Sequence, residues 1–431
     1  MCGIIGYSGQ REPLPILLDG LSRLEYRGYD SAGIAIIDGE SLTIEKKEGK
    51  LQVLKDHLVD KEINGNIGIG HTRWATHGVP SDENAHPHYD NNQDFAIIHN
   101  GIIENYAEMK EVLLNENNEF KSETDTEVVA VELSRQWTGN LLETVCNVAK
   151  GLEGTYALVV TTIKEPETIV AGRMMSPLVL GVGEDEVFLA SDSAAILEHT
   201  NKMIFLENGD FVEIKNGQYQ LFDIDMNEIT REVQIIDWEV SEAEKSGHDH
   251  FMYKEILEQS EVIERTITGR LELGSEQIPI DLEHAKKFEK IWIVACGTAY
   301  HAGLFGKDLF EKVLGIPVSV ELASEFRYRE PIVGKNDLGI VISQSGETMD
   351  TIAATELLKD NGSHVLALVN VVGSSLARMA DSVLYLHVGP EIGVASTKAY
   401  LGMLVGQLLL AKHWDEFNKL ETSFDEISEL P

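Results

Sequence analysis

The chain has 431 residues, of which 43% are hydrophobic and 25% are charged, as in ordinary globular proteins. At roughly 100 to 200 residues per domain, this length predicts two or three domains. Asp and Glu number 72 against 35 Lys and Arg, and the formal net charge of −37 argues against nucleic acids and anionic membranes as partners. The same acidic excess fits either a halophilic cytoplasm or an acidic enzyme.

The three cysteines, Cys2, Cys146 and Cys296, are too few and too scattered for a disulfide framework or a zinc site. The amino terminus has no basic segment followed by a long apolar one, so we expect no signal peptide. The longest apolar stretch, residues 400–411, is shorter than the roughly 20 residues that span a bilayer. These features predict a cytoplasmic protein.

Short apolar runs rich in β-branched residues predict strands in the first half of the chain. These runs are residues 33–37, 95–99, 156–161 and 187–190. Helical spacing predicts helices at residues 15–24, 106–114 and 126–136, the last with Asp125 as its N-cap. The fold class expected up to residue 235 is therefore α+β.

The second half begins with a polar, acidic segment, residues 237–250, which we interpret as a linker. A helix is predicted at residues 251–273, followed by short buried strands that alternate with helices. The strands are residues 291–295, 318–321, 338–343, 365–370 and 383–388. This alternation predicts a doubly wound α/β domain with a parallel sheet. The expected domains are 1–235 and 281–431, joined by a linker and connecting helix at 236–280.

Cys2 gains unusual chemistry if Met1 is removed, because it then carries both a thiol and a free α-amine. An α-amine with a pKa of about 7.7 to 8.0 can accept the thiol proton near neutral pH. One residue would then supply both nucleophile and base, as in threonine enzymes activated by their own amino terminus. The alternative is that Cys2 is only a small residue on a short strand.

Three further motifs supply groups that fit an amide substrate. Arg73 offers a planar fork for a carboxylate, although a lone arginine more often forms a surface ion pair. The Asn100 amide and the Gly101 N–H, which follow a predicted strand, could both donate to an oxyanion or could simply form a turn. Asp125 could hold an ammonium group or cap a helix.

Together these segments resemble the class II glutamine amidotransferases in order and spacing. The motifs are MCGI at the amino terminus, LEYRGYDSAG at 24–33, HTRWATHG at 71–78, HNGIIEN at 99–105 and SETDTE at 122–127. The resemblance implies an N-terminal-nucleophile fold, with two stacked antiparallel sheets between helical layers, that hydrolyses the glutamine amide to glutamate and ammonia. It assigns the nucleophile to Cys2, the oxyanion donors to Asn100 and Gly101, the carboxylate partner to Arg73, the ammonium partner to Asp125, the pocket lining to Thr76 and His77, and an ammonia gate to Trp74.

No metal or organic cofactor is expected. The pairs His86 with His88 and His248 with His250 have no neighbouring Cys or carboxylate group that would complete a metal site. The thiol and amine of Cys2 suffice for the hydrolysis.

In the second half, SQSGET at 343–348 joins a predicted strand to a helix. Hydroxyls and free N–H groups at such a junction can bind one anion, aided by the helix dipole. The segment lacks the lysine of an ATP-binding loop, which favours a monophosphate ligand. A helix cap without a ligand is the alternative.

CGTA at 296–299, ELASEFRYRE at 321–330, SQSGET and EIGVASTKAY at 391–400 resemble the first sugar isomerase (SIS) domain of the glutamine-dependent fructose-6-phosphate aminotransferases. The resemblance assigns phosphate binding to Ser343, Gln344, Ser345 and Thr348, and sugar contacts to Thr298, Val394 and Ser396. It implies that ammonia from glutamine aminates fructose 6-phosphate. The Cys296 side chain is interpreted as a buried structural thiol.

Members of that family carry a second sugar isomerase domain that this sequence does not contain. We therefore expect a fragment, a truncated product or half of a split enzyme, which hydrolyses glutamine but makes little amino sugar alone. A homodimer, and a separate chain carrying the second isomerase domain, are the expected protein partners. The alternatives are another class II amidotransferase and a non-catalytic sugar-phosphate sensor.

Overall fold

The computed structural model describes residues 2–25, 29–39, 41–74, 78–236, 247–272, 275–420, 426, 427 and 429. The chain divides into two compact units, Met1–Val240 and Ser241–Pro431. Most of the predicted linker, residues 237–246, lies outside the described residues. Within the described part, none of the helices combines the length and apolar character needed to span a bilayer.

The first unit contains an antiparallel sheet of eight strands in the order β15-β11-β9-β10-β1-β4-β2-β3. Its strands are β1 (Gly3–Ser8), β2 (Ser31–Asp38), β3 (Ser41–Glu48), β4 (Ile67–Arg73), β9 (Val179–Val182), β10 (Val187–Ala190), β11 (Lys202–Phe205) and β15 (Gln234–Ile235). Strand β1 lies between β10 and β4, so the start of the chain enters the sheet interior.

A second antiparallel sheet of seven strands has the order β14-β13-β12-β8-β7-β6-β5. Its strands are β5 (His88–Tyr89), β6 (Phe95–Ile103), β7 (Gly154–Thr162), β8 (Glu165–Met174), β12 (Asp210–Lys215), β13 (Gln218–Asp223) and β14 (Glu228–Ile229). Apolar side chains such as Ile4 and Ile69 from the first sheet and Ile98 and Val159 from the second form one core. The two sheets are therefore stacked face to face.

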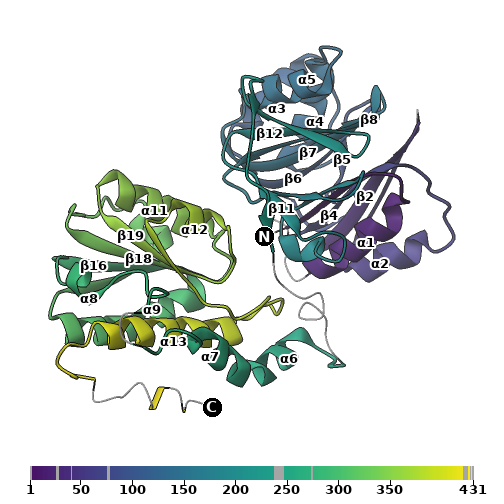
Figure 1. Cartoon of the computed structure of the whole chain (residues 1–431). Helices are drawn as coiled ribbons and strands as arrows, with labels where there is room; N and C mark the ends of the chain where they lie inside the picture. The colour runs from purple at the N-terminus through teal and green to yellow at the C-terminus, as the bar shows by residue number, and fades with distance from the viewer. Residues whose placement is uncertain are drawn as a thin grey trace. The chain divides into compact units, whose positions relative to one another are not determined.

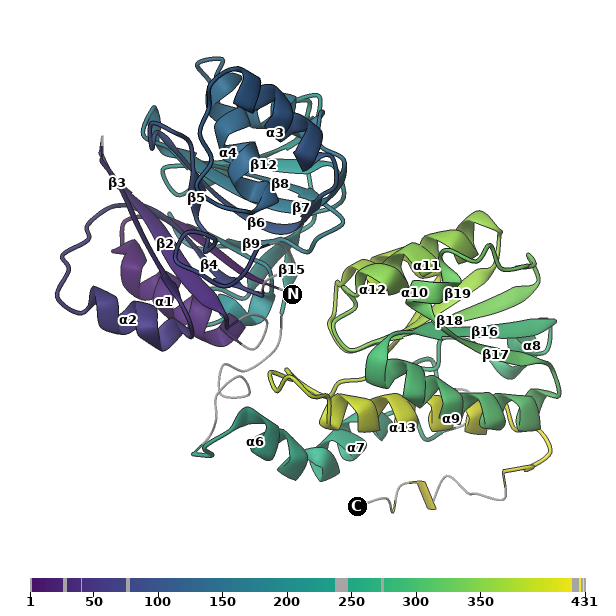
Figure 2. The ribbon, with the colours of Figure 1, turned by 180° about the vertical axis from the view of Figure 1, so that it is seen from behind.

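Helices cover the outer faces of both sheets (Figure 1). They are α1 (Pro13–Leu24), α2 (Leu51–Leu58), α3 (Tyr106–Asn115), α4 (Asp125–Arg135) and α5 (Leu141–Ala149). Buried side chains of α1 and α2 pack on the eight-stranded sheet, those of α4 and α5 pack on the seven-stranded sheet, and α3 packs on α4. Figure 2 shows the same layers from behind. The predicted layered N-terminal-nucleophile fold is confirmed.

Two sequence-based details of this unit are wrong. The N-cap of α4 is Thr124, whose hydroxyl accepts the Glu127 N–H, so Asp125 is the first helical residue. The strand predicted to end at residue 99 continues to Ile103, because β7 pairs with it as far as Gly154. Asn100 and Gly101 consequently lie within a strand and not in a turn.

The second unit is built on a five-stranded parallel sheet in the order β17-β16-β18-β19-β20. The strands are β16 (Lys290–Ala295), β17 (Val318–Leu322), β18 (Asp337–Ser343), β19 (His364–Val369) and β20 (Ser382–Tyr385). The helices are α6 (Phe251–Leu257), α7 (Gln259–Ile267), α8 (Leu282–Ala285), α9 (Gly297–Leu314), α10 (Ala323–Phe326), α11 (Met349–Asp360), α12 (Ser375–Met379) and α13 (Lys398–His413).

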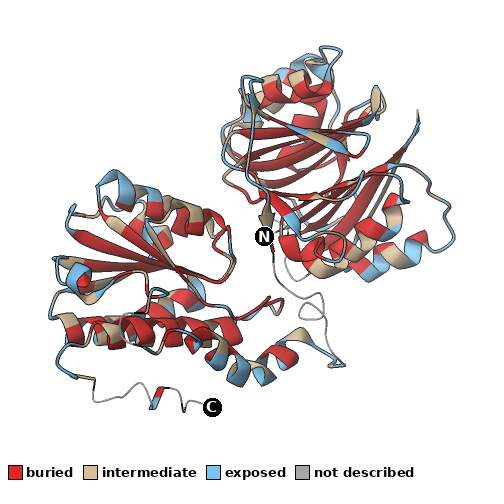
Figure 3. Cartoon of the chain, in the orientation of Figure 1, coloured by how far each residue is buried: buried red, intermediate tan, exposed pale blue. Residues whose placement is uncertain are grey.

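Helices α7, α9 and α13 share one core with the sheet, and α10, α11 and α12 share the core on its other face. Figure 3 shows the strands buried between these helical layers. The predicted doubly wound α/β fold is confirmed.

The helix predicted at 251–273 is in fact two helices that meet at Glu258. The second helix ends at Ile267, and Gly269 follows with a φ of +74°, a left-handed conformation that favours glycine. The strand predicted at 383–388 ends at Tyr385, ahead of His387 with a φ of +55°.

Candidate active site

Cys2 immediately precedes β1 and contacts the end of β4. The Trp74 N–H donates to Cys2 Sγ at 3.2 Å, and Sγ lies 3.6 Å from the Trp74 carbonyl oxygen. Glycine at position 3 lets β1 pair closely with β4 next to Cys2, because a Cβ atom on Gly3 would lie only 2.6 Å from Thr72 Oγ1. The thiol is thus fixed beside the HTRWATHG motif, 72 residues away in sequence.

Burial raises the pKa of the Cys2 thiol, and this effect outweighs the Trp74 N–H bond, which lowers it. The thiol is therefore mainly protonated at neutral pH and needs a base before it can attack a carbonyl carbon. An α-amine on the same residue would meet this requirement.

Asn100 reaches Cys2 from the second sheet. Its Nδ2 donates to the Cys2 carbonyl oxygen at 2.9 Å, and its side chain is nearly buried. Gly101 has a φ of +138°, and a Cβ there would lie 2.0 Å from the Thr155 carbonyl oxygen. The structure thus brings Asn100 to Cys2, and only glycine fits at the next position, 101.

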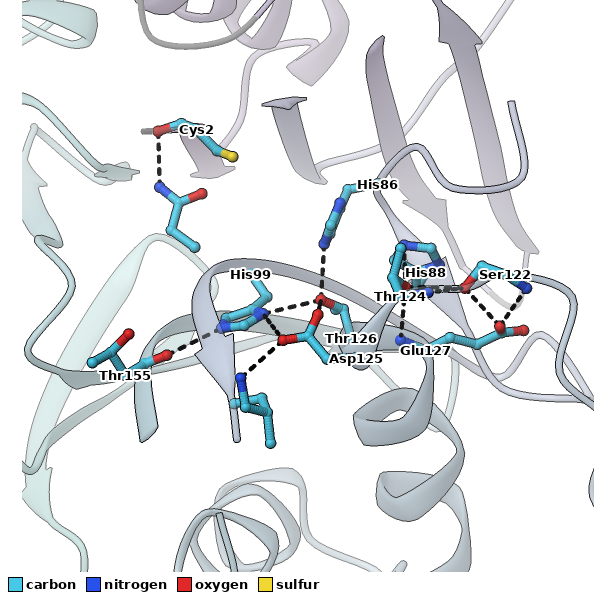
Figure 4. A network of polar contacts seen from close by, with 12 residues as sticks. Cys2, His86, His88, His99, Ser122, Thr124, Asp125, Thr126, Glu127 and Thr155 are labelled. Atoms are coloured by element: carbon cyan, nitrogen blue, oxygen red, sulfur yellow. Dashed lines mark hydrogen bonds and ion pairs between the residues drawn. The ribbon is translucent and has the colours of Figure 1, made fainter. Parts of the chain in front are cut away.

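Buried histidines surround these residues. His71 Nε2 lies 2.9 Å from Asn100 Oδ1 and 3.1 Å from the His99 carbonyl oxygen. In Figure 4, His86 and His99 converge on Thr126, whose hydroxyl is 3.0 Å from a ring nitrogen of each. Sequence reasoning did not select His71 or His99 as site residues, although both belong to the motifs that it quoted.

His88 contacts the N-cap of α4, with Nε2 3.0 Å from Thr124 Oγ1 (Figure 4). The pair His86 and His88 therefore bonds to threonine hydroxyls within the protein. No group of three or more His, Cys, Asp or Glu side chains in the described residues is arranged to hold a metal ion.

Arg73 and Asp125, the predicted partners of the two ends of glutamine, are both buried in this unit. Arg73 is 3% exposed and donates from Nη2 to the Gly78 carbonyl oxygen at 3.2 Å, so the alternative of a surface ion pair is wrong. Asp125 Oδ2 accepts the Ile103 N–H at 2.9 Å and lies 4.0 Å from His99 Nδ1.

Trp74 is 45% exposed and makes an edge contact with Tyr29 at 5.3 Å between ring centroids. The two remaining predicted pocket residues, Thr76 and His77, lie outside the described residues.

The strand order of the second unit creates a second candidate site. From β16 the chain continues to β17 on one side and then to β18 on the other, so the order reverses between β16 and β18. Ligands of open parallel sheets bind at such a point, outside the carboxyl ends of the strands. Thr298, which follows β16, and Ser343, which ends β18, are both at this edge.

The loop after β18 is held by its own hydroxyls. Ser343 Oγ lies 3.1 Å from Thr348 Oγ1 and accepts the Gly346 N–H at 3.0 Å. Gly346 has a φ of +66°, and a Cβ there would lie 2.1 Å from Ser374 Oγ. Thr348 is the N-cap of α11 but makes no side-chain cap bond. The first N–H groups of α11 have no acceptor within the helix, as at any helix start.

The other predicted phosphate residues belong to the same loop. Ser345 Oγ accepts the Glu347 N–H at 3.2 Å, and the Gln344 carbonyl oxygen accepts the Asn370 N–H at 3.2 Å. Asn370 also donates from Nδ2 to the Gly389 carbonyl oxygen at 2.7 Å. This buried asparagine, which sequence reasoning did not select, links the SQSGET loop to the segment after β20.

The loop that carries the predicted sugar contacts is held by a buried carboxylate of α6. Glu255 Oε1 accepts the N–H groups of Ile392 at 2.6 Å and Gly393 at 2.9 Å, and Glu255 is 2% exposed. Val394 is 72% exposed, whereas Ser396 Oγ is buried and makes no hydrogen bond within the described residues. No sequence signal could identify Glu255, because its partners are 137 and 138 residues away.

Cys296 is the N-cap residue of α9, directly after β16, and is partly buried. Its Sγ lies 4.0 Å from Thr351 Oγ1, and burial raises the pKa of its thiol. The thiol was predicted to be buried, and the structure leaves it only partly so.

Comparison with known families matches both units. A glutamine amidotransferase domain matches residues 55–245, and a SIS domain matches residues 285–412. The chain is 50% identical over 434 residues to a protein of Clostridium tetani, covering 100% of this chain and 71% of the relative. It is 51% identical to a protein of Caldanaerobacter subterraneus subsp. tengcongensis and 48% identical to one of Thermus thermophilus, each over 95% of this chain and 68% of the relative. All three are named glutamine--fructose-6-phosphate aminotransferase [isomerizing].

Proposed function

The chain belongs to the family of isomerising glutamine--fructose-6-phosphate aminotransferases, and from this premise we propose how its residues divide the reaction. The reaction is the transfer of ammonia from glutamine to fructose 6-phosphate, which gives glucosamine 6-phosphate and glutamate. The glutamine amidotransferase unit performs the hydrolysis, and the SIS unit binds the sugar phosphate.

In the proposed hydrolysis, the free α-amine of Cys2 takes the thiol proton and the thiolate attacks the amide carbon of glutamine. Asn100 Nδ2 and the Gly101 N–H donate to the oxyanion that forms. The Cys2 ammonium then returns a proton to the leaving nitrogen, ammonia departs, and water hydrolyses the thioester to glutamate. The hydrogen bond between Cys2 and Asn100 supports this assignment. Nδ2 has two hydrogens and gives one to the Cys2 carbonyl oxygen, which leaves the second for the oxyanion.

Arg73 is proposed to bind the α-carboxylate of glutamine and Asp125 its α-ammonium group, with Thr76, His77 and Trp74 around them. Burial of Arg73 and Asp125 supports these roles, because charged groups act more strongly where water is excluded. In the SIS unit, we assign the phosphate to Ser343, Gln344, Ser345 and Thr348, and the sugar to Thr298, Val394 and Ser396. The position of the SQSGET loop at the reversal of strand order supports this assignment.

The single observation that carries the proposal is the contact of the Cys2 thiol with Trp74 and of the Cys2 carbonyl with Asn100. The test measures glutamate and glucosamine 6-phosphate separately, with purified wild-type chain and with Cys2→Ala. We expect glutamate release from the wild type and none above background from the variant. Intact mass must show that Met1 is absent from active material. Equal glutamate release by Cys2→Ala, or activity with Met1 retained, would overturn the assignment.

We also propose a homodimer, which family resemblance supports and which light scattering after size-exclusion chromatography tests. A separate chain carrying a second isomerase domain is the other proposed partner, and mixing the two chains tests it. The functional domains are proposed as 1–235 and 281–431, with 236–280 as linker and connecting helix.

A further inference from the structure

The orientation of the Asn100 carboxamide is determined by its two neighbours. One end faces the Cys2 carbonyl oxygen at 2.9 Å, and that oxygen can only accept a hydrogen bond, so this end is Nδ2. The other end is therefore Oδ1, which lies 2.9 Å from His71 Nε2. His71 Nε2 also faces the His99 carbonyl oxygen at 3.1 Å, again a pure acceptor. His71 must carry its proton on Nε2 and donate it to both oxygens.

Several contacts hold this imidazole in place. His71 lies in β4 with no exposed surface, and its ring stacks on His86 at 4.2 Å between centroids and 29° between planes. Burial lowers the pKa of His71 to about 3, so the ring is neutral at ordinary pH and has a single N–H. His86 is in turn bonded to Thr126, whose hydroxyl lies 3.3 Å from Asp125 Oδ1. The contacts thus connect Asn100 with Asp125.

We propose that His71 is a positioning residue for glutamine hydrolysis, whose Nε2–H fixes the Asn100 carboxamide with Nδ2 toward the nucleophile. The inference rests on the proposed function, which makes Asn100 an oxyanion donor. Without the His71 donor, the carboxamide can turn about its last bond and present Oδ1 to the reaction centre. An oxygen there repels the developing negative charge, whereas Nδ2 stabilises it.

The experiment compares His71→Phe, which keeps a flat ring but has no N–H, with His71→Gln, which restores a donor. We expect His71→Phe to lower kcat for glutamine hydrolysis by about 10- to 100-fold, less than the 10²- to 10³-fold typical of losing an oxyanion donor. The KM for glutamine should change little, because Arg73 and Asp125 are untouched. His71→Gln should recover part of kcat. His199→Phe is the matched control, since His199 also stacks on a ring, that of Phe188, and has no proposed role.

A double-mutant cycle with Asn100→Ala separates positioning from general damage. We expect His71→Phe to cost little further activity once the Asn100 side chain is absent. Equal fold-losses in both backgrounds, or equal losses in His71→Phe and His71→Gln, would overturn the positioning role. Wild-type kcat in Asn100→Ala would instead overturn the proposed oxyanion donor. Circular dichroism checks folding, and His71→Leu takes the place of a Phe variant that does not fold.

Discussion

Replacement of Gly101 by alanine tests whether strand β6 fixes the proposed oxyanion donors, Asn100 and Gly101. The φ of +138° is costly for any residue with a side chain, at about 1 to 3 kcal/mol. The new Cβ would also meet the Thr155 carbonyl oxygen at 2.0 Å and His99 Nε2 at 2.9 Å. Such overpacking adds about 1 to 3 kcal/mol. We therefore expect Gly101→Ala to lower the free energy of unfolding of this unit by about 2 to 6 kcal/mol.

Gly139→Ala is the matched control. Gly139 also has a positive φ, +98°, but no atom lies within 4 Å of a Cβ there. Gly139→Ala should lose only the free energy that the positive φ costs. The difference in free energy of unfolding between the two variants is therefore the cost of the steric clash at Gly101, about 1 to 3 kcal/mol. Hydrogen exchange of β6 and β7 peptides across a urea series measures the unfolding of this unit alone. We also expect kcat for glutamine hydrolysis to fall about 100-fold in Gly101→Ala only. Equal stability of the two variants, with wild-type kcat in Gly101→Ala, would refute the reasoning.

Three further predictions concern charged side chains. Burial lowers the pKa of Lys46 from 10.5 to about 8. Between these pH values the unfolded chain binds more protons than the folded one, so the free energy of unfolding should rise with pH. In urea unfolding, Lys46→Met should show a smaller rise over this range. Glu255→Gln weakens the hydrogen bonds that the Glu255 carboxylate accepts from the loop carrying Val394 and Ser396, because an amide is neutral and only one of its two polar atoms accepts. Calorimetry should therefore show weaker binding of fructose 6-phosphate, while glutamine hydrolysis stays unchanged. Arg73→Lys should raise the KM for glutamine about 10- to 100-fold, because lysine can replace only one of the two hydrogen bonds that the guanidinium group is proposed to donate to the carboxylate. An unchanged KM would contradict this role.

Much of the fold follows from local patterns in the sequence. The run at 187–190 is strand β10 without adjustment, and the helix predicted at 106–114 differs from α3 by one residue. These elements have an apolar pattern and clear boundaries, which are properties of neighbouring residues.

Boundaries that depend on distant partners were not predictable in this way. β6 extends to Ile103 only because β7 supplies hydrogen bonds to a segment that locally looks like an Asn-Gly turn. A tertiary contact overrides local preference there. The break at Glu258 was not predicted either, and no contact among the described residues explains it.

The motifs included Trp74 and Asn100, which contact Cys2, but they did not show how these side chains are held. Asn100 was selected for its amide, whereas the histidine that orients that amide, His71, lies on a strand of the other sheet. The stacking of two sheets creates this contact, and no spacing along the sequence encodes it. Thr76 and His77 remain predictions.

Asn100 and Gly101 project from the interior of a strand that pairs with its neighbour along nine residues, Phe95 to Ile103. A loop would have to become ordered around each glutamine molecule, and that loss of entropy would recur in every turnover. A strand is ordered once, when the protein folds. In the proposed mechanism, the two hydrogen-bond donors are therefore preorganised, and the rearrangement of solvent dipoles that slows amide hydrolysis in water is largely avoided.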